Sequence, residues 1–228
     1  MSTFTSTEQT ENMKNILLIG ASGFVGSAIL KEALERGHSV TALIRDPAKL
    51  TIRHPNLNAV SGNASSADEI TCTAKGMDVV ISAYNPGWKN PNIYQEILAT
   101  YPAIIAGTKR AGVGRLLVVG GAGSLNVTPG RSLIESGQIP ASLLPGVKGQ
   151  AEVYSRLLIP EKKLDWVFFS PSAELFSGKR TGNFRLGKDD LIVDGQGQSR
   201  ISVQDYAAAM IDEMEHPAHH RERFTAGY

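Results

Sequence analysis

Cysteine is almost absent from this sequence: Cys72 is the only one in 228 residues, so no intramolecular disulfide can form. Such sparse use of cysteine is typical of proteins in a reducing compartment, and we expect a cytoplasmic protein. Long hydrophobic runs are also missing, because no stretch approaches the roughly 20 apolar residues that a membrane span needs. The beginning of the chain lacks the basic and apolar regions of a secretory signal. No membrane association is therefore expected.

An excess of charge of either sign is missing as well. The 23 basic and 22 acidic side chains nearly cancel and leave a formal net charge of +1. Such a balance provides no general attraction to nucleic acid, so a small-molecule substrate is the expected partner. The length fits one α/β domain. We expect residues 1–13, which are rich in Ser, Thr, Glu and Gln, to form a disordered polar tail before a single domain over 14–228.

Short apolar segments alternate with amphipathic ones over most of the chain. Strands are predicted at 14–20, 38–45, 57–62, 78–83, 116–120 and 164–169. Helices are predicted after the first strand as far as Gly37, and at 67–74, 92–111 and 149–158. The apolar strands lack a clean in-and-out alternation, which is typical of a parallel sheet covered on both faces. The sequence therefore predicts a doubly wound α/β fold.

Three regions are less regular. Pro102 falls inside the predicted 92–111 helix and should kink or split it. Residues 121–146 are rich in Gly, Pro and Ser, and we expect a long loop there that forms a substrate lid. Near the C-terminus we expect strands at 191–193 and 199–202, whereas the pattern at 225–228 is too weak to indicate an element. A helix is predicted at 203–215, with Ser202 and Asp205 spaced as a capping box.

A glycine pattern follows the first predicted strand directly. Gly20, Gly23 and Gly26 are spaced as GxxGxxG and open an amphipathic helix. The first glycine permits a tight turn, the second lets the backbone approach a pyrophosphate, and the third allows close contact between helix and strand. Amide groups at the helix start then face the anion, and Ser22 can add a hydrogen bond. We therefore predict a Rossmann-type phosphate loop for NADP(H) or NAD(H); the alternative is a glycine turn without a ligand.

The end of the second predicted strand distinguishes the two cofactors. An NAD-selective site places a carboxylate there, whereas a guanidinium can bind the 2′-phosphate of NADP. Arg45 arrives at this position and Lys49 is near enough to assist, so NADP is the preferred cofactor. Asp46 would select NAD instead if the strand ended one residue later. The alternative for Arg45 and Lys49 is a solvated surface turn.

Three segments resemble the atypical short-chain dehydrogenase/reductase proteins, and most of all their NAD(P)H-binding branch. They are GASGFVG at 20–26, VTALIRD at 40–46 and DGQGQSRIS at 194–202. That branch contains NmrA-like proteins, biliverdin-IX-beta and flavin reductases, and bacterial proteins named as NADH-flavin reductases. The resemblance covers most of the chain after the polar tail. It implies one Rossmann-type domain with a small C-terminal extension on the substrate side.

The resemblance also implies which residues hold the cofactor. Contacts are expected from the phosphate loop and from the ends of later strands: Gly20, Ser22, Gly23, Phe24, Val25, Arg45, Asn63, Ala64, Ser82, Ala83, Tyr84, Gly120, Gly121, Lys148 and Pro171. Asn63 would lie beside the adenine, Gly120 and Gly121 beside the nicotinamide, and Pro171 over the nicotinamide ring. These positions agree with the general rule that ligands bind outside the carboxyl ends of parallel strands.

Conventional members of the superfamily carry a Tyr-x-x-x-Lys motif in which the lysine lowers the pKa of the tyrosine. Here Leu158 stands four residues after Tyr154, so the motif is broken. Ser124 lies close to the usual serine position, and Lys148 lies at the start of the predicted 149–158 helix. Both are catalytic candidates, Lys148 toward the nicotinamide ribose or a substrate carbonyl; the alternatives are a loop serine and a solvated lysine. Tyr154 is expected to pack rather than to act as an acid.

Other reactive side chains give weaker signals. His216, His219 and His220 are expected at the surface without a metal, because no cysteine or strand scaffold accompanies them. Asp189 and Asp190 are expected in a solvated turn rather than as a catalytic pair.

Three apolar or aromatic residues outside the motifs also invite an interpretation. Cys72 is expected to be buried in its helix, and Trp166 to lie in the core. Trp88 follows the fourth predicted strand and either walls a substrate pocket or packs within a loop.

The missing acid does not exclude hydride transfer, since a flavin or quinone can take its proton from water. We therefore predict an NAD(P)H-dependent oxidoreductase that reduces a small planar acceptor, namely a flavin, a quinone or a carbonyl compound. The alternatives are an NAD(P)-sensing regulatory protein without turnover, and an NAD-dependent epimerase or dehydratase of a sugar-like substrate. A monomer or a homodimer is expected.

Overall fold

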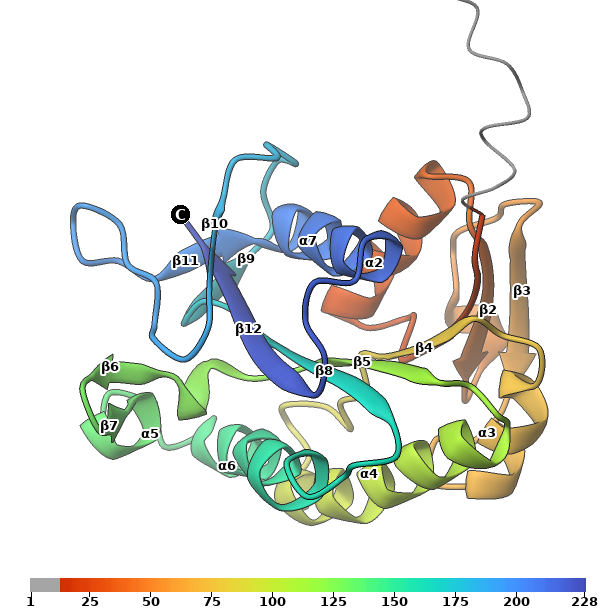
Figure 1. Cartoon of the computed structure of the whole chain (residues 1–228), viewed down its shortest axis with the longest axis horizontal. Coiled ribbons are helices and arrows are strands. Elements are labelled where there is room, and N and C mark those ends of the chain that lie inside the picture. Colours follow the sequence, from red (N-terminus) through yellow and green to blue (C-terminus); the bar gives the residue numbers. More distant parts are fainter. Residues whose placement is uncertain (1–12) are drawn as a thin grey trace, which may run out of the picture.

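The computed structural model describes residues 13–228 and contains an eight-stranded, mostly parallel sheet (Figure 1). In spatial order its strands are β10 (Arg185–Gly187), β12 (Glu222–Gly227), β8 (Asp165–Ser170), β5 (Arg115–Val119), β4 (Val79–Ser82), β1 (Asn15–Ile19), β2 (Ser39–Ile44) and β3 (Leu57–Ser61). Within this sheet β10, at one edge, runs antiparallel to its neighbour. The tail predicted for 1–13 lies outside the described residues, apart from its last residue.

Helices cover both faces of the sheet, which confirms the predicted Rossmann-type, doubly wound single domain (Figure 1). The two faces are covered by different helices: α2 (Phe24–Glu35) and α7 (Val203–Glu215) on one, and α3 (Ala67–Ala74), α4 (Ile93–Arg110) and α6 (Leu144–Glu152) on the other. Successive residues of β1 turn to opposite faces, with Leu18 buried on the α2 side and Leu17 on the α4 side. Because both faces are buried, the strands show no polar alternation.

Two helices differ from prediction at a proline. Pro102 does not split α4, which is continuous from Ile93 to Arg110. Pro102 is exposed, so water can reach the carbonyl group that loses its partner. The helix predicted at 149–158 begins five residues earlier, because Pro145 fits the first turn of α6, where no amide hydrogen is needed. A π-helical segment at Val153–Leu158 continues α6.

The 121–146 segment, predicted as one long loop, is built of short elements. In chain order they are a 3₁₀ turn (Ala122–Ser124), β6 (Asn126–Thr128), β7 (Arg131–Ser132), α5 (Leu133–Ser136) and the start of α6. Ser132 and Glu135 form a reciprocal capping box that begins α5. The prediction of a loop was wrong because elements this short contain too few residues for a periodic pattern.

The C-terminal segment supplies an inner strand that was not predicted. β12 runs parallel to β8, and the rings of Phe224 and Phe169 stack with centroids 4.1 Å apart. The strand expected at 191–193 is not formed, and the edge strand β10 lies earlier in the chain. The strand expected at 199–202 is found as β11 (Arg200–Ser202), paired with β9 (Glu174–Phe176).

Charged residues explain why β12 escaped notice. Glu222 and Arg223 lie at its beginning, and such residues rarely occupy a buried strand. Glu222 forms an ion pair with Lys188, and Arg223, which is 6% exposed, forms one with Asp189. Partners from the loop that follows β10 therefore pair with the charges of β12 and allow a polar sequence to form a buried strand.

Asp205 fastens the C-terminus to the loop before β10. As predicted, the Ser202 hydroxyl caps α7 by accepting from the Asp205 amide at 3.0 Å, but the reciprocal half of the capping box is not formed. The buried Asp205 carboxylate instead accepts from the amides of Thr181 and Gly182 and from the hydroxyls of Thr181 and Tyr228, at 2.6–2.8 Å. Burial by itself would raise the pKa of Asp205, but these hydrogen bonds outweigh it and hold the pKa below its usual value.

Two further expectations concern single side chains. Trp166 lies in the core as predicted. Cys72 is exposed, which corrects the expectation of burial: Ile70 and Ala74 form the inward face of α3, and Cys72 lies between them on the other side. Among the helices of residues 13–228, none has the length and apolarity needed to cross a membrane.

Replacing Asp205 by alanine should lower the free energy of unfolding by about 3 kcal/mol near neutral pH, because four donors lose a charged acceptor. Since its folded-state pKa is lowered, the contribution is complete above the unfolded pKa of about 3.9 and is lost as pH falls through the folded value. Urea titrations should show that the difference in free energy of unfolding between wild type and Asp205→Ala becomes smaller below about pH 4. Asp68→Ala, which removes an exposed ion pair with Arg110, should lower the free energy of unfolding far less. A gap independent of pH would contradict this account.

Candidate functional site

The turn between β1 and α2 brings three backbone segments into close contact. Gly20 has a φ of +85°, which is in the left-handed region, and a Cβ atom there would lie 2.5 Å from the carbonyl oxygen of Ala83. A Cβ atom on Gly26 would collide with the carbonyl oxygen of Gly20. Gly23 has more room, since its nearest neighbour would be 3.4 Å away. The first and third glycines are therefore demanded by the fold itself, and the second is not.

The start of α2 offers free backbone donors beside this turn. Gly23 precedes the helix and gives no side-chain cap, and the first turn carries no acidic residue. The first amides of a helix have no partner within it, and the helix dipole adds a partial positive charge. This cradle has the donors and the open backbone that the diphosphate of a nicotinamide dinucleotide requires. The residues present therefore fit that cofactor.

A cavity of about 830 Å³ opens over this cradle at the carboxyl ends of β1, β2, β4 and β5. Most of the predicted contact residues line it, namely Gly20, Ser22, Gly23, Phe24, Val25, Arg45, Asn63, Ala64, Ala83, Tyr84, Gly120, Gly121 and Pro171. Ser82, Ser124 and Lys148 are not among its lining residues. The volume suits a ligand of cofactor size.

The end of β2 places a cation, not a carboxylate, at the cavity. β2 ends at Ile44, and the next residue, Arg45, is exposed and lines the cavity. Among residues 13–228 its side chain has no hydrogen-bond or ion-pair partner. The Asp46 carboxylate turns away and accepts from the Ala48 amide at 3.1 Å, which begins a 3₁₀ turn at Pro47–Lys49. Lys49 does not line the cavity.

The opposite end of the cavity, beyond β5, is apolar. A Cβ atom on Gly120 would lie 2.5 Å from the Phe168 ring, so the backbone there admits no side chain. The 121–147 segment contributes Leu133, Ile139, Leu143 and Val147 to the lining. Trp88 is half exposed and also lines the cavity, so it forms part of a pocket wall. Three lining residues in the described part of the chain are ionisable: Arg45, Tyr84 and Glu96.

Ser124, one of the two catalytic candidates, is held by a buried arginine. Its hydroxyl and its carbonyl oxygen accept from Nη1 of Arg223 at 2.8 and 3.0 Å. Arg223 also donates to Asp189 at 2.6 Å, so Asp189 is a buried arginine's partner and not simply part of a solvated turn. This geometry gives Ser124 a structural task, fastening the loop after β5 to β12. Sequence analysis missed Arg223 because β12 itself was not predicted.

Lys148, the other candidate, is exposed within α6 and not at its start. The physical reason is that Gly146, Gly149 and Gln150 form the buried face of α6, which leaves Lys148 on its exposed side. Val147 and Gln150 of α6 line the cavity, and the sequence did not single out Gln150. Tyr154 packs on Phe168 with ring centroids 5.0 Å apart, and burial raises the pKa of its hydroxyl.

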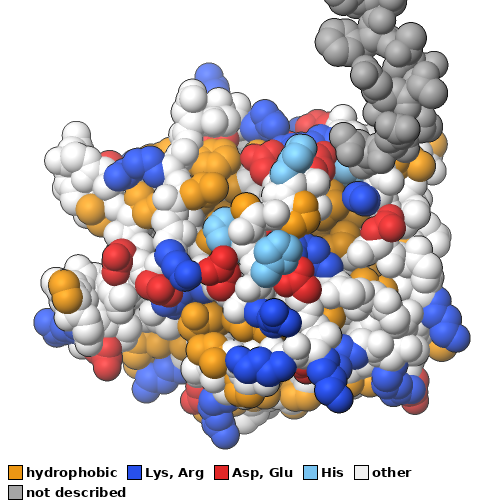
Figure 2. All heavy atoms as spheres, viewed as in Figure 1, with side chains coloured by type: hydrophobic (Ala, Val, Ile, Leu, Met, Phe, Trp, Pro, Cys, Tyr) orange, Lys and Arg blue, Asp and Glu red, His pale blue; other side chains and the backbone are white. Residues whose placement is uncertain are grey.

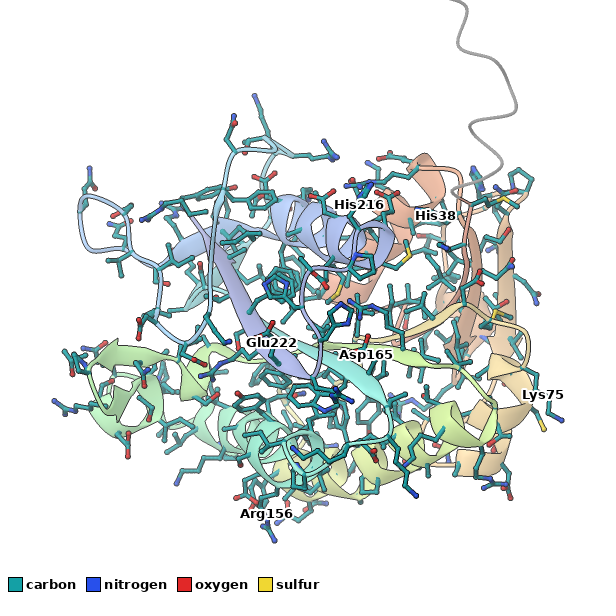
Figure 3. All side chains as sticks on the ribbon, in the orientation of Figure 1. His38, Lys75, Arg156, Asp165, His216 and Glu222 are labelled. Atoms are coloured by element: carbon teal, nitrogen blue, oxygen red, sulfur yellow. The ribbon has the colours of Figure 1, made fainter. Side chains whose placement is uncertain are left out.

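Two of the histidines near the C-terminus lie within hydrogen-bond distance of carboxylates. Nδ1 of His219 lies 2.7 Å from Glu213, and Nδ1 of His220 lies 2.9 Å from Asp165. In the described part of the chain no group of His, Cys, Asp and Glu has the arrangement of a metal site. His216, labelled in Figure 3, follows the end of α7. Acidic, basic and histidine side chains intermix over α7 and β12 (Figure 2).

Comparisons with known proteins show the family of this chain. A family model described as NAD(P)H-binding matches residues 20–217. The uncharacterized protein YwnB of Bacillus subtilis is 39% identical over 211 residues, which are 91% of this chain and 95% of that protein.

Two solved structures extend the comparison. A protein of Bacteroides thetaiotaomicron, provisionally named an epimerase, is 56% identical with a TM-score of 0.90, covering 95% of this chain and 97% of that one. SP1627 of Streptococcus pneumoniae, provisionally named an NADH-flavin reductase, is 31% identical with a TM-score of 0.79, covering 94% and 99%.

Two alanine substitutions should separate binding from folding in the phosphate loop. Gly23→Ala should leave the melting temperature nearly unchanged, since its Cβ has room, but should weaken dinucleotide binding because a methyl group enters the cradle. Gly26→Ala should lower the melting temperature clearly, because its Cβ meets the Gly20 carbonyl group. Thermal unfolding with and without NADPH measures both effects. Equal changes in melting temperature for Gly23→Ala and Gly26→Ala would refute the distinction between a binding glycine and a structural one.

Proposed function

Since this chain belongs to the NAD(P)H-binding family, we propose that it is an NADPH-dependent reductase that passes hydride to a small planar acceptor such as a flavin or a quinone. The observation that carries this proposal is the chemistry of the cavity wall. Arg45 follows β2, Tyr84 follows β4 and Glu96 lies on α4. Among residues 13–228, the lining residues that follow β5 and β8 therefore include no ionisable side chain. An acceptor that takes its proton from water suits such a wall.

In this proposal the bound nicotinamide supplies the hydride, and the chain supplies position. Amides at the start of α2 hold the diphosphate, and the backbone at Gly120 and Gly121 leaves a flat space beyond β5. Leu133, Ile139 and Leu143 give that space an apolar wall. The acceptor would enter between this apolar segment and Trp88, whose ring offers a stacking surface.

Epimerisation is the second candidate function, because the relative from Bacteroides thetaiotaomicron carries that provisional name. Epimerases and dehydratases of sugar-like substrates need positioned acid and base groups. The cavity wall beyond β5 offers amides and apolar groups instead, which favours the reductase. A nicotinamide sensor without turnover would bind NADPH and oxidise none of it. The oligomeric state, monomer or homodimer, and the cytoplasmic location stay predictions.

Arg45 should select NADPH over NADH. Arg45→Ala should weaken NADPH binding by about 10- to 100-fold, as expected for the loss of charge-assisted hydrogen bonds to a phosphate, and should leave NADH binding nearly unchanged. Calorimetric titration with both reduced cofactors measures the two affinities. Arg53→Ala, which removes an exposed cation that does not line the cavity, is the matched control. Equal losses for both cofactors would refute the assignment.

The proposed reaction should proceed without a protein acid. Wild-type protein should oxidise NADPH in the presence of a flavin or a quinone, and Glu96→Gln should keep kcat within about threefold, whereas loss of a general acid costs about 100-fold or more. Stopped assays at steady state, followed by product analysis, make the comparison. No turnover with any acceptor, or a loss of about 100-fold in Glu96→Gln, would contradict the proposal.

A further inference from the structure

Gln150 is a buried polar side chain on the cavity wall whose oxygen atom has no partner among residues 13–228. It projects from α6, is 6% exposed and lines the cavity. Its Oε1 is shielded from solvent and has no hydrogen-bond partner in the described part of the chain. Leaving such an atom unpaired costs about 1–3 kcal/mol, so a buried amide without a partner needs an explanation.

The neighbours of Gln150 hold it in place without satisfying it. Tyr101 of α4 is fully buried; burial raises the pKa of its hydroxyl, and the nearby side chains of Ser82 and Gln150 oppose that rise. The Tyr101 hydroxyl also lacks a well-aligned partner. Gly149 packs so closely on Ile97 that a Cβ atom there would lie 3.2 Å from its side chain. The backbone of α6 at Gln150 is therefore firmly seated on α4.

The position of Gln150 relates it to one end of the cavity. A Cβ atom on Gly121 would lie 3.3 Å from Cβ of Gln150, so the side chain lies directly beside the end of β5. That is the end at which the proposed function places the reacting rings. Leu143 and Val147 surround the same space, and in an apolar setting a hydrogen bond is both stronger and more selective.

We propose that the Gln150 carboxamide recognises an amide or imide group on a ring bound beyond β5, and so acts as a specificity-determining residue. A carboxamide offers a donor and an acceptor side by side, and an amide or imide edge of the ligand matches both. Two ligands of the proposed reaction carry this chemistry: the carboxamide of the nicotinamide and the imide edge of a flavin acceptor. This inference rests on the proposed function, because it needs NADPH and its acceptor in the cavity.

Ligand pairs that differ in one N–H group test the proposal. The acetylpyridine analogue of NADPH keeps the carbonyl oxygen of the nicotinamide carboxamide and lacks its N–H groups. A flavin methylated at the imide nitrogen lacks the imide N–H. Wild-type protein should prefer the parent compound over its partner by about tenfold in one of the two pairs. Affinities for the cofactor pair come from calorimetry, and kcat/KM values for the flavin pair from NADPH oxidation. The pair that shows the preference identifies the ligand that Gln150 contacts.

Variants at position 150 then assign the preference to this side chain. Gln150→Met keeps the length and removes both polar atoms, so it should abolish the preference in the pair that shows it. Gln150→Glu keeps the oxygen acceptors and provides a second variant should the first fail to fold. Gln95→Met, on the exposed face of α4, is the matched control and should change neither ratio.

The outcomes separate the inference from the function on which it rests. No preference in either pair for the wild type, or a preference that survives in Gln150→Met, would overturn the role of Gln150 while NADPH oxidation continued. Absence of NADPH binding and oxidation in the wild type would instead overturn the proposed function.

Discussion

The contact between Gly26 and the carbonyl group of Gly20 is the constraint on which the binding site depends. α2 can start directly at the end of β1 only because no side chain separates the helix from the turn. Ala83, just past β4, closes on Gly20 from the other side. The free amides at the start of α2 are thereby fixed at the carboxyl edge of the sheet. A dinucleotide anchored there can extend past β2 in one direction and past β5 in the other, and the cavity follows both directions.

The second half of the cavity depends on the end of the chain. β12 inserts beside β8, and its Arg223 reaches the loop after β5 through Ser124. Asp189 balances the charge of this arginine, because an unpaired buried charge would be costly. The apolar wall of the cavity is thus held by residues about a hundred positions apart in the chain. This explains why a fold with a local phosphate motif still needs its C-terminal strand.

Those features of the molecule that depend on local chemistry were predictable from the sequence. Spacing and polarity alone predict the turn glycines, Arg45 at the end of β2 and the strands that are buried on both faces of the sheet. β12 was hidden because its charges are neutralised by partners distant in sequence, which no local pattern reports. Gln150 was missed for another reason: it lies inside the helix predicted at 149–158, and no local pattern reports that its side chain faces the cavity with an unpaired oxygen.

The polar groups at the two ends of the cavity differ in charge, and the cost of burying a charge explains the difference. Arg45 is exposed, so its charge keeps most of its hydration and needs no partner within the protein. Beyond β5, the polar side chains that line the cavity carry no charge, and the buried Arg223 behind this wall is paired with Asp189. Burial raises the pKa of Tyr101, so that its hydroxyl stays neutral as well. A charged group there would require its own counterion. A neutral wall with an unpaired amide can still discriminate strongly, since a ligand that fails to match it leaves a buried polar group without a hydrogen bond. If the proposed function holds, selectivity at this end depends on hydrogen-bond complementarity, and affinity at the other depends on charge.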